Sequence, residues 1–385
     1  MQKARTRVSH SPLALATGVL MNLLSSCSPA APGGVPTPVA TPRGAVLVPA
    51  SDERIGVMGR TERTKDGGHR FGYPGVTLRL ALDGPSISMR ARSTSGDSRL
   101  SISVDGAAPH TLRLTKVDAD WLLAEGLGSG EHQIEIAHRT ETWQGVVSVL
   151  GFTLPPGARL LSARAFPERR LLVIGDSVTS GEGVDRTEEC QADKPAGSNA
   201  LGSYGMLLAR ALGAQVHLVS YGGRGLIRDW QGKRDTLNAP QFFDLTIAEE
   251  SPKVLWNHAT YKPDAVLISL GANDFNLALG ALPEREEYVG AYVTFLRAVR
   301  AVYPAAHLFL TEGAMVNDQA DPRRPQKAVL REYLREVVKR LGDPKLSAID
   351  SEHYSGDRCD SHPTAVQHQA MARDLEPLLR SPLAW

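Results

Sequence analysis

The sequence predicts two folded domains, a β-sandwich followed by an α/β domain with a mostly parallel, doubly wound sheet. Within residues 46–154, short segments alternate apolar and polar residues and are separated by turn residues, which is typical of sandwich strands. After Pro155, Pro156 and Gly157 the pattern changes to short continuous apolar runs separated by stretches of helical periodicity. The length of 385 residues is sufficient for two separate cores.

The N-terminal segment is predicted to be a targeting signal and not part of either domain. Three basic residues precede a mostly apolar run over residues 12–24, which is too short to span a membrane but suits a signal peptide. The run ends in Leu-Ser-Ser-Cys, which resembles a bacterial lipobox in which Cys27 is lipidated. We therefore expect a signal peptide over residues 1–27 and a lipoprotein that begins at Cys27. An ordinary signal peptide followed by a chance cysteine is the alternative.

Residues 28–45 are rich in Pro, Ala, Gly and Thr and show no periodicity. Such a composition favours an extended, semi-rigid tether between an anchor and the first domain.

The predicted sandwich domain occupies residues 46–165. Its clearest strand patterns lie at residues 76–82, 86–91, 100–104, 132–137 and 146–154. Because large apolar side chains fall at every second position of these segments, one face of each strand is expected to be buried.

The predicted α/β domain occupies residues 166–385, with a boundary near Phe166. Buried strands are expected at residues 171–175, 216–220, 265–270, 307–310 and 346–349. Apolar residues at helical spacing predict helices over 288–299 and 330–341.

Composition excludes some classes of function. The formal net charge is +1 and the sequence has no basic stripe, so we expect no nucleic-acid partner. The histidines lack metal-ligand spacing and form no cluster with cysteines, so neither a metal site nor a cofactor is expected.

Ser177 is the candidate nucleophile because it follows a buried strand at the carboxyl edge of the predicted sheet, where ligands bind. The segment reads Gly-Asp-Ser, and Gly181 lies four residues beyond the serine, so the α/β-hydrolase elbow G-x-S-x-G is not matched. A helix N-cap after the strand is the alternative interpretation.

Three further loops after predicted strands carry polar or glycine residues. In Tyr-Gly-Gly-Arg-Gly, the backbone N–H of Gly223 could approach a substrate oxygen, or the loop could be a simple turn. Asn273 could donate to an oxyanion or could make an Asx turn. His362 is a candidate base because its unperturbed pKa lies near neutral pH, although a lone histidine is more often structural.

These four positions, in this order, resemble the sequence blocks of the SGNH branch of the GDSL hydrolases at Ser177, Gly223, Asn273 and His362. The sandwich ahead of them makes the chain similar to carbohydrate esterase family two, in which a jelly-roll domain precedes an SGNH domain. Members of that family remove acetyl groups from plant or microbial polysaccharides.

The resemblance implies acyl transfer to Ser177 with His362 as general base, and an oxyanion hole formed by the N–H groups of Ser177 and Gly223 and the Asn273 side chain. One position departs from the family pattern, because Cys359 stands three residues before the histidine, where an aspartate is usual. We expect Asp360 to orient His362. Asp357, or a backbone carbonyl in a Ser–His dyad, is the alternative.

Cys190 and Cys359 remain after the lipidated cysteine, an even number in an exported protein. We expect a disulfide between them that fastens two active-site loops together. Two buried free thiols are the alternative.

The two resemblances, to the lipobox and to carbohydrate esterase family two, together imply a lipid-anchored carbohydrate O-acetylesterase of the bacterial cell envelope, similar to acetylxylan esterases. Its expected partners are an acetylated carbohydrate and, through the lipid alone, a membrane. The alternatives are a GDSL lipase, thioesterase or lysophospholipase, and an inactive carbohydrate-binding lipoprotein. Trp121 and Trp143 could stack on sugars, but packing in the sandwich core is the preferred interpretation for both.

Overall fold

The computed structural model describes residues 37–187, 189–190 and 193–385. The expected signal peptide over residues 1–27, its lipidation site Cys27 and the first part of the expected tether lie outside the described residues. In the described ranges, none of the helices combines the length and the apolar character that crossing a membrane requires.

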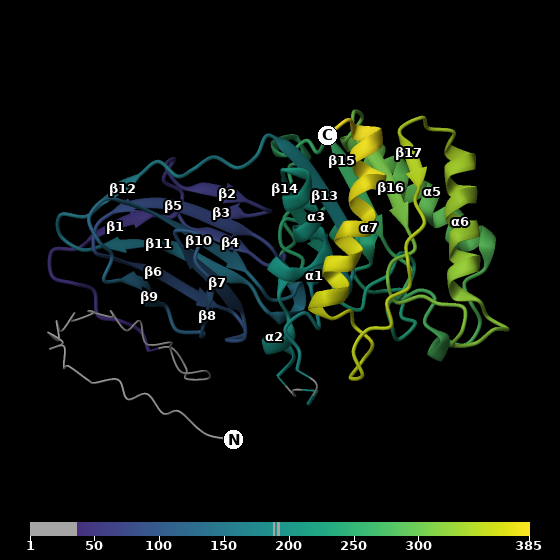
Figure 1. Cartoon of the computed structure of the whole chain (residues 1–385), viewed down its shortest axis with the longest axis horizontal. Coiled ribbons are helices and arrows are strands. Elements are labelled where there is room, and N and C mark those ends of the chain that lie inside the picture. The colour runs from purple at the N-terminus through teal and green to yellow at the C-terminus, as the bar shows by residue number, and fades with distance from the viewer. Residues whose placement is uncertain (1–36, 188, 191–192) are drawn as a thin grey trace, which may run out of the picture. The chain divides into compact units, whose positions relative to one another are not determined.

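The first domain is a sandwich of two antiparallel sheets (Figure 1). Its strands are β1 (Val46–Pro49), β2 (Gly56–Met58), β3 (Glu62–Arg63), β4 (His69–Phe71), β5 (Thr77–Asp83), β6 (Ser86–Ser93), β7 (Arg99–Val104), β8 (His110–Arg113), β9 (Ala119–Glu125), β10 (Glu131–His138), β11 (Val147–Leu154) and β12 (Arg159–Leu161). One sheet has the order β3-β4-β11-β6-β9, with β1 also paired to β11. The other has the order β12-β5-β10-β7-β8, with β2 also paired to β5. The predicted β-sandwich is therefore confirmed.

The alternation of apolar and polar residues along the strands explains which side chains form the core of the sandwich. In β6, Ile87, Met89 and Ala91 are buried and point toward the facing sheet, as period-two patterning requires. Trp121 of β9 is only 1 % exposed, and its indole N–H donates to the Ala91 carbonyl over 2.7 Å. The prediction that Trp121 packs in the core is confirmed. Sequence patterning missed β9, because Trp121, Leu122 and Leu123 form a continuous apolar run there.

The second domain is built on a five-stranded parallel sheet in the order β14-β13-β15-β16-β17. Its strands are β13 (Arg169–Gly175), β14 (Ala214–Ser220), β15 (Ala265–Ser269), β16 (His307–Thr311) and β17 (Leu346–Ala348). Its helices are α1 (Ser177–Ser180), α2 (Lys194–Gly197), α3 (Tyr204–Leu212), α4 (Ala239–Phe242), α5 (Arg285–Val302), α6 (Gln326–Leu341) and α7 (Ala365–Leu383).

Helices cover both faces of this sheet. Leu171 and Val173 of β13 belong to the same apolar cluster as residues of α3 and α7. Leu172 and Ile174, which point the other way, share a cluster with residues of α5 and α6. A strand buried on both faces needs a continuous apolar run, and this is the pattern from which the parallel sheet was predicted. The doubly wound α/β fold is confirmed.

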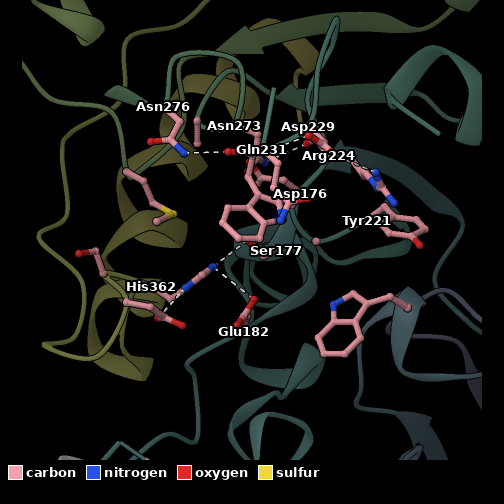
Figure 2. Close-up of a pocket in the computed structure, with 18 of the residues that line it drawn as sticks. Asp176, Ser177, Glu182, Tyr221, Arg224, Asp229, Gln231, Asn273, Asn276 and His362 are labelled. Atoms are coloured by element: carbon pink, nitrogen blue, oxygen red, sulfur yellow. Dashed lines mark hydrogen bonds and ion pairs between the residues drawn. The ribbon is translucent and has the colours of Figure 1, made fainter. Parts of the chain in front are cut away.

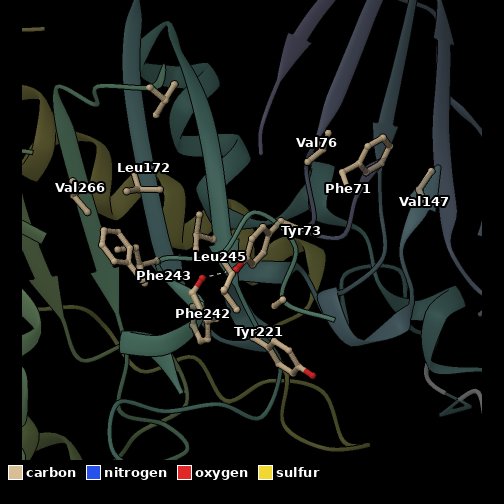
Figure 3. Packing of buried hydrophobic residues seen from close by; sticks show 14 of the residues in the cluster. Phe71, Tyr73, Val76, Val147, Leu172, Tyr221, Phe242, Phe243, Leu245 and Val266 are labelled. Atoms are coloured by element: carbon tan, nitrogen blue, oxygen red, sulfur yellow. Dashed lines mark hydrogen bonds between the residues drawn. The ribbon is translucent and has the colours of Figure 1, made fainter. Parts of the chain in front are cut away.

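The two domains share one apolar core. The expected boundary at Phe166 falls between β12 and β13, and side chains from both sides of it pack together (Figure 3). Tyr73 of the sandwich is buried against this core, and its hydroxyl donates to the Phe242 carbonyl of α4 over 2.6 Å. The buried Arg60 guanidinium donates to the carbonyls of Phe243 and Leu245. The sandwich is thus packed onto the α/β domain through an extensive buried contact.

Candidate active site

The central strands of the sheet deliver the candidate residues to one edge. Chain order reverses at β13, with β14 on one side and β15 on the other, which is the position where open α/β sheets form a ligand crevice. Ser177 follows β13, Gly223 follows β14 and Asn273 follows β15. Since the three strands are parallel, their carboxyl ends bring these residues together.

Ser177 opens the short helix α1, but it does not cap that helix. Asp176 is the N-cap, and its Oδ1 accepts from the Val178 N–H over 3.1 Å. The Ser177 hydroxyl is therefore available for a different contact, and Oγ lies 2.8 Å from His362 Nε2 (Figure 2). A cap is present here, as the alternative interpretation supposed, yet the residue that makes it is Asp176.

His362 lies on the loop between β17 and α7 and is oriented by Asp360. Its Nδ1 lies 2.7 Å from Asp360 Oδ1, on the side of the ring opposite Ser177. Asp357 makes different contacts, because its Oδ1 accepts from the N–H groups of Cys359 and Asp360 at 2.9 and 3.0 Å. The structure thus places Ser177, His362 and Asp360 in one hydrogen-bonded row and gives Asp357 to the loop backbone.

Charges around His362 favour its protonated form. Burial alone lowers the pKa of His362, but the hydrogen bond to Asp360 and the negative charge of Glu182 together raise it above its ordinary value. For Asp360 the effects are reversed, because burial raises the pKa of a carboxyl group. The contacts with His362 and Arg186 outweigh burial and hold the pKa of Asp360 well below the usual range. Asp360 is consequently a carboxylate at neutral pH, and His362 is a stronger base than a free imidazole.

Two backbone N–H groups are free to bind an oxyanion. In the described part of the chain, neither the Ser177 nor the Gly223 N–H has a protein acceptor. Gly223 has φ = +74°, and a Cβ there would lie 2.6 Å from Cδ1 of Trp230. Glycine is required at this position because of both the left-handed backbone and the adjacent indole.

The Asn273 amide completes this arrangement. Its Nδ2 donates to the Arg224 carbonyl over 2.9 Å and to Asp176 Oδ2 over 3.3 Å. The second bond is long, so a substrate oxygen could replace it at small cost. Burial raises the pKa of Asp176 to about 6.

Sequence reasoning missed Asp274, which shapes the glycine loop. This fully buried carboxylate accepts from the N–H groups of Leu226 and Ile227, both over 2.8 Å, and of Arg228 over 3.2 Å. Despite these bonds, burial raises its pKa to about 6. Asp274 follows Asn273 directly in a Gly-Ala-Asn-Asp run, and its position beside a candidate residue was the available signal.

A disulfide joins Cys190 and Cys359, with 5.4 Å between their Cα atoms. It ties the loop after α1 to the loop that carries Asp360 and His362. Arg186, also missed from the sequence, spans the same two loops and donates to Asp357 Oδ2 over 2.9 Å. The catalytic loop is thus fixed by covalent and ionic contacts.

The Ser177 and His362 side chains line a cleft of about 710 Å³. Two exposed indoles also line it: Trp143 of the sandwich is 41 % exposed and Trp230 is 55 % exposed. The core-packing prediction for Trp143 was wrong. Trp143 lies in the 3-10 helix η1 (Thr142–Gln144) and not in a strand, so its neighbours Thr142 and Gln144 are buried while its own side chain lines the cleft.

Comparisons with known proteins agree with both domains. Residues 57–163 match the family model for the carbohydrate esterase 2 N-terminal domain, and residues 173–370 match the GDSL-like lipase/acylhydrolase family. An acetylxylan esterase / glucomannan deacetylase of Cellvibrio japonicus is 39 % identical over 338 residues, covering 88 % of this chain and 91 % of that protein. The chain belongs to carbohydrate esterase family two. It is therefore a carboxylic ester hydrolase.

Solved structures of family two esterases have the same arrangement of domains. One from Cellvibrio japonicus superposes with a TM-score of 0.84 at 39 % identity, covering 89 % of this chain and 99 % of that one. Another, from Clostridium thermocellum in complex with cellohexaose, gives a TM-score of 0.78 at 28 % identity, covering 86 % and 99 %.

One group of residues at the site of this family two esterase has the spacing of metal ligands. Within the described residues, one ligand atom each from Glu182, Asp360 and His362 lies within 4.8 Å of the others. Arg186 pairs with both carboxylates, so a guanidinium already supplies positive charge at this point. His362 Nε2 is moreover engaged with Ser177. This donor set therefore fits hydrogen bonding better than metal coordination.

Replacing Gly223 by alanine is expected to lower kcat/KM for an aryl acetate by about 10²-fold or more, since removing one oxyanion donor costs about that much. The new Cβ would collide with Trp230 and shift the Gly223 N–H. Gly232→Ala is the matched control, because its φ is +86° but its Cβ would meet only Leu279, at 3.4 Å. Steady-state kinetics should give the control a rate within about threefold of the parent, and equal losses in both variants would contradict the oxyanion assignment.

Proposed function

We propose that this family two esterase removes O-acetyl groups from a polysaccharide or oligosaccharide by way of an acetyl-Ser177 intermediate. The observation that carries the proposal is the row Asp360–His362–Ser177 in a cleft that two exposed indoles also line. Aromatic faces are suited to the apolar faces of sugar rings.

The geometry supports the following sequence of steps. Ser177 Oγ attacks the acetyl carbonyl carbon, and its proton passes to His362 Nε2 while Asp360 holds Nδ1. The oxyanion is bound by the N–H groups of Ser177 and Gly223 and by the Asn273 amide. The sugar oxygen leaves as an alcohol with the proton from Nε2. Water, deprotonated by the same nitrogen, then releases acetate from Ser177.

The relatives support a glycan substrate. The Cellvibrio japonicus protein that is 39 % identical is called an acetylxylan esterase / glucomannan deacetylase. The Clostridium thermocellum structure holds cellohexaose. We accordingly propose acetylated xylan or glucomannan as the first substrates to examine.

A substrate panel tests the proposal. Protein lacking the residues before Ser28 should release acetate from acetylated xylan or glucomannan and should hydrolyse an aryl acetate. Long-chain acyl esters, lysophospholipids and acyl thioesters should be turned over at least about tenfold more slowly in kcat/KM. Preference for a long acyl chain would overturn the proposal in favour of a lipase or thioesterase. Binding of the glycan without any acetate release would favour an inactive carbohydrate-binding protein.

Trp143→Ala should raise KM for the acetylated polymer by about tenfold, the loss of about 1.4 kcal/mol of binding. KM for an aryl acetate should change by a smaller factor, because that substrate has no sugar chain to stack on the indole. Trp230→Ala tests the second indole that lines the cleft in the same way. The exposed Val117, which does not line the cleft, provides a control as Val117→Ala. An unchanged polymer KM in both tryptophan variants would contradict stacking on the substrate.

We also propose that the chain is exported and anchored in the cell envelope by a lipid on Cys27. The basic start, the short apolar run and the Leu-Ser-Ser-Cys sequence support this. Membrane contact through the lipid alone predicts that Cys27→Ala releases the enzyme into the soluble envelope fraction. Retention of this variant in the membrane fraction would refute the anchor.

A further inference from the structure

The sandwich domain reaches the catalytic loops through residues 139–143. The Arg139 carbonyl accepts from the Ala200 N–H over 3.0 Å. The Thr142 hydroxyl donates to the Ser220 carbonyl, at the end of β14, over 2.6 Å. These contacts hold the segment directly behind the glycine loop that contains Gly223.

Between these two anchors lies Glu141, whose carboxyl group is 0 % exposed. Neither of its oxygens accepts a hydrogen bond from an N–H or O–H group within the described residues. A Cβ added at Gly222 would lie 2.1 Å from Glu141 Oε2, so the carboxyl fills the space that a side chain at residue 222 would need. A buried carboxylate without donors is costly, which favours a protonated acid at this position.

The neighbour of this carboxyl is Glu182, which lies within hydrogen-bonding reach of Glu141. Glu182 Oε2 also lies 3.3 Å from His362 Nε2 (Figure 2). On its other oxygen, Glu182 pairs with Arg186 at 3.2 Å and with Lys194 at 3.7 Å. Within the described residues no ion pair joins a cation to Glu141, so Glu141 is the member of the pair to which we assign the proton.

Electrostatics agree with that assignment. Burial and the negative charge of Glu182 raise the pKa of Glu141 well above its ordinary range. Asp176 raises it further and Lys194 lowers it. Two carboxyl groups in one poorly solvated site share a proton for this reason.

We propose that Glu141 of the sandwich domain is a positioning residue for ester hydrolysis, acting as a neutral acid that donates a hydrogen bond to Glu182 and holds this carboxylate beside His362 Nε2. The inference rests on the proposed function, because it assigns His362 as the base.

The position of this hydrogen bond has a direct consequence for the proton on Nε2. After Ser177 attacks, Nε2 carries the proton that the departing sugar oxygen must receive. Glu182 stabilises the resulting imidazolium by its charge. The bond from Glu141 occupies one oxygen of Glu182 and holds this carboxylate in place beside Nε2. The proton then passes to the sugar oxygen, and Glu182 gains none.

The decisive comparison is Glu141→Met against Glu141→Gln, measured with an aryl acetate across the pH range. Methionine has a similar size but cannot donate, so the negative charge of Glu182 is no longer shared with a donor and acts more strongly on His362, whose pKa rises. We expect kcat to fall by at least about tenfold and the acid limb of kcat/KM to move to higher pH. Glutamine donates through its amide and should restore most of kcat and the parent acid limb. His362 also faces Asp360, Arg186 and Asp176, which are unchanged in both variants.

A second pair of variants separates positioning from folding. In a Glu182→Gln background, Glu141→Met should no longer move the acid limb. Glu125→Met, at an exposed glutamate of the same sandwich, is the control and should leave the limb and kcat unchanged. Difference infrared spectra of the parent against Glu141→Gln should contain the band of one protonated carboxyl group at neutral pH, and this measurement does not require the methionine variant to fold.

Each outcome of these experiments decides for or against the role of Glu141. Absence of the protonated carboxyl band, or a Glu141→Met variant with parent kcat and acid limb, would overturn the proposal. Equal impairment of the methionine and glutamine variants without a shift of the limb would also overturn it, because a purely structural role predicts that outcome. A parent protein that fails to hydrolyse any acetate would instead refute the proposed function.

Discussion

Ser177→Ala is expected to lower kcat for an aryl acetate by about 10⁴–10⁶-fold, the range found when a serine hydrolase loses its nucleophile. The hydroxyl forms the bond to the acetyl group, and no other side chain can replace it at 2.8 Å from His362 Nε2. KM should change little, since the oxyanion donors and the cleft walls remain. Mass spectrometry after mixing with substrate should detect an acetyl adduct on the parent protein and none on the variant.

Ser180→Ala is the matched control on the same short helix. The Ser180 hydroxyl bonds to the Asp176 carbonyl and to the Ser220 hydroxyl, and it does not line the cleft. Its removal should lower the melting temperature modestly and leave kcat within about threefold of the parent. Full activity in Ser177→Ala would show that the nucleophile has been misassigned.

Asp360→Asn is expected to lower kcat by about 10²–10⁴-fold, approaching the loss seen when a triad aspartate becomes asparagine. The asparagine amide no longer accepts from Nδ1 with a full charge, so the imidazolium loses its main partner. The acid limb of kcat/KM should move to lower pH. The sign follows because Asp360 raises the pKa of His362, and only the neutral imidazole can accept the Ser177 proton.

Asp357→Asn provides the comparison on the same loop. Asp357 contacts Arg186 and two backbone N–H groups but not the imidazole, so the acid limb should stay near that of the parent. If Asp360→Asn keeps kcat within about threefold and the acid limb does not move, the enzyme works as a Ser–His dyad. The pH profiles of both variants decide between these mechanisms.

Much of the α/β domain could be predicted because its signals are local. The runs before Ser177, Gly223 and Asn273 are continuous and apolar, and such runs form strands buried on both faces. Parallel strands expose their carboxyl ends together, so three separate loops could be assigned to one edge. Strand β9 of the sandwich was missed because sandwich strands were recognised by alternating apolar and polar residues, and the apolar run in β9 does not alternate.

The interface between the domains could not be predicted in this way. Trp143 was predicted to pack in the sandwich core, whereas its side chain, in the 3-10 helix η1, lines the cleft. Glu141 carries no signal in the sequence, because its neighbours Gly222 and Glu182 belong to the other domain. Only Glu182, five residues after the nucleophile, lay near a recognisable block.

The sequence by itself determined the two domains, the nucleophile and base candidates and the oxyanion loops, because each depends on residues that are close along the chain. The tertiary structure decided which aspartate faces His362, and it placed Glu141 and Trp143 beside the catalytic loops. The places of Glu141 and Trp143 depend on how the sandwich packs against β14. That packing is fixed by the shared core and by buried donors such as Tyr73, whose partners are distant in sequence.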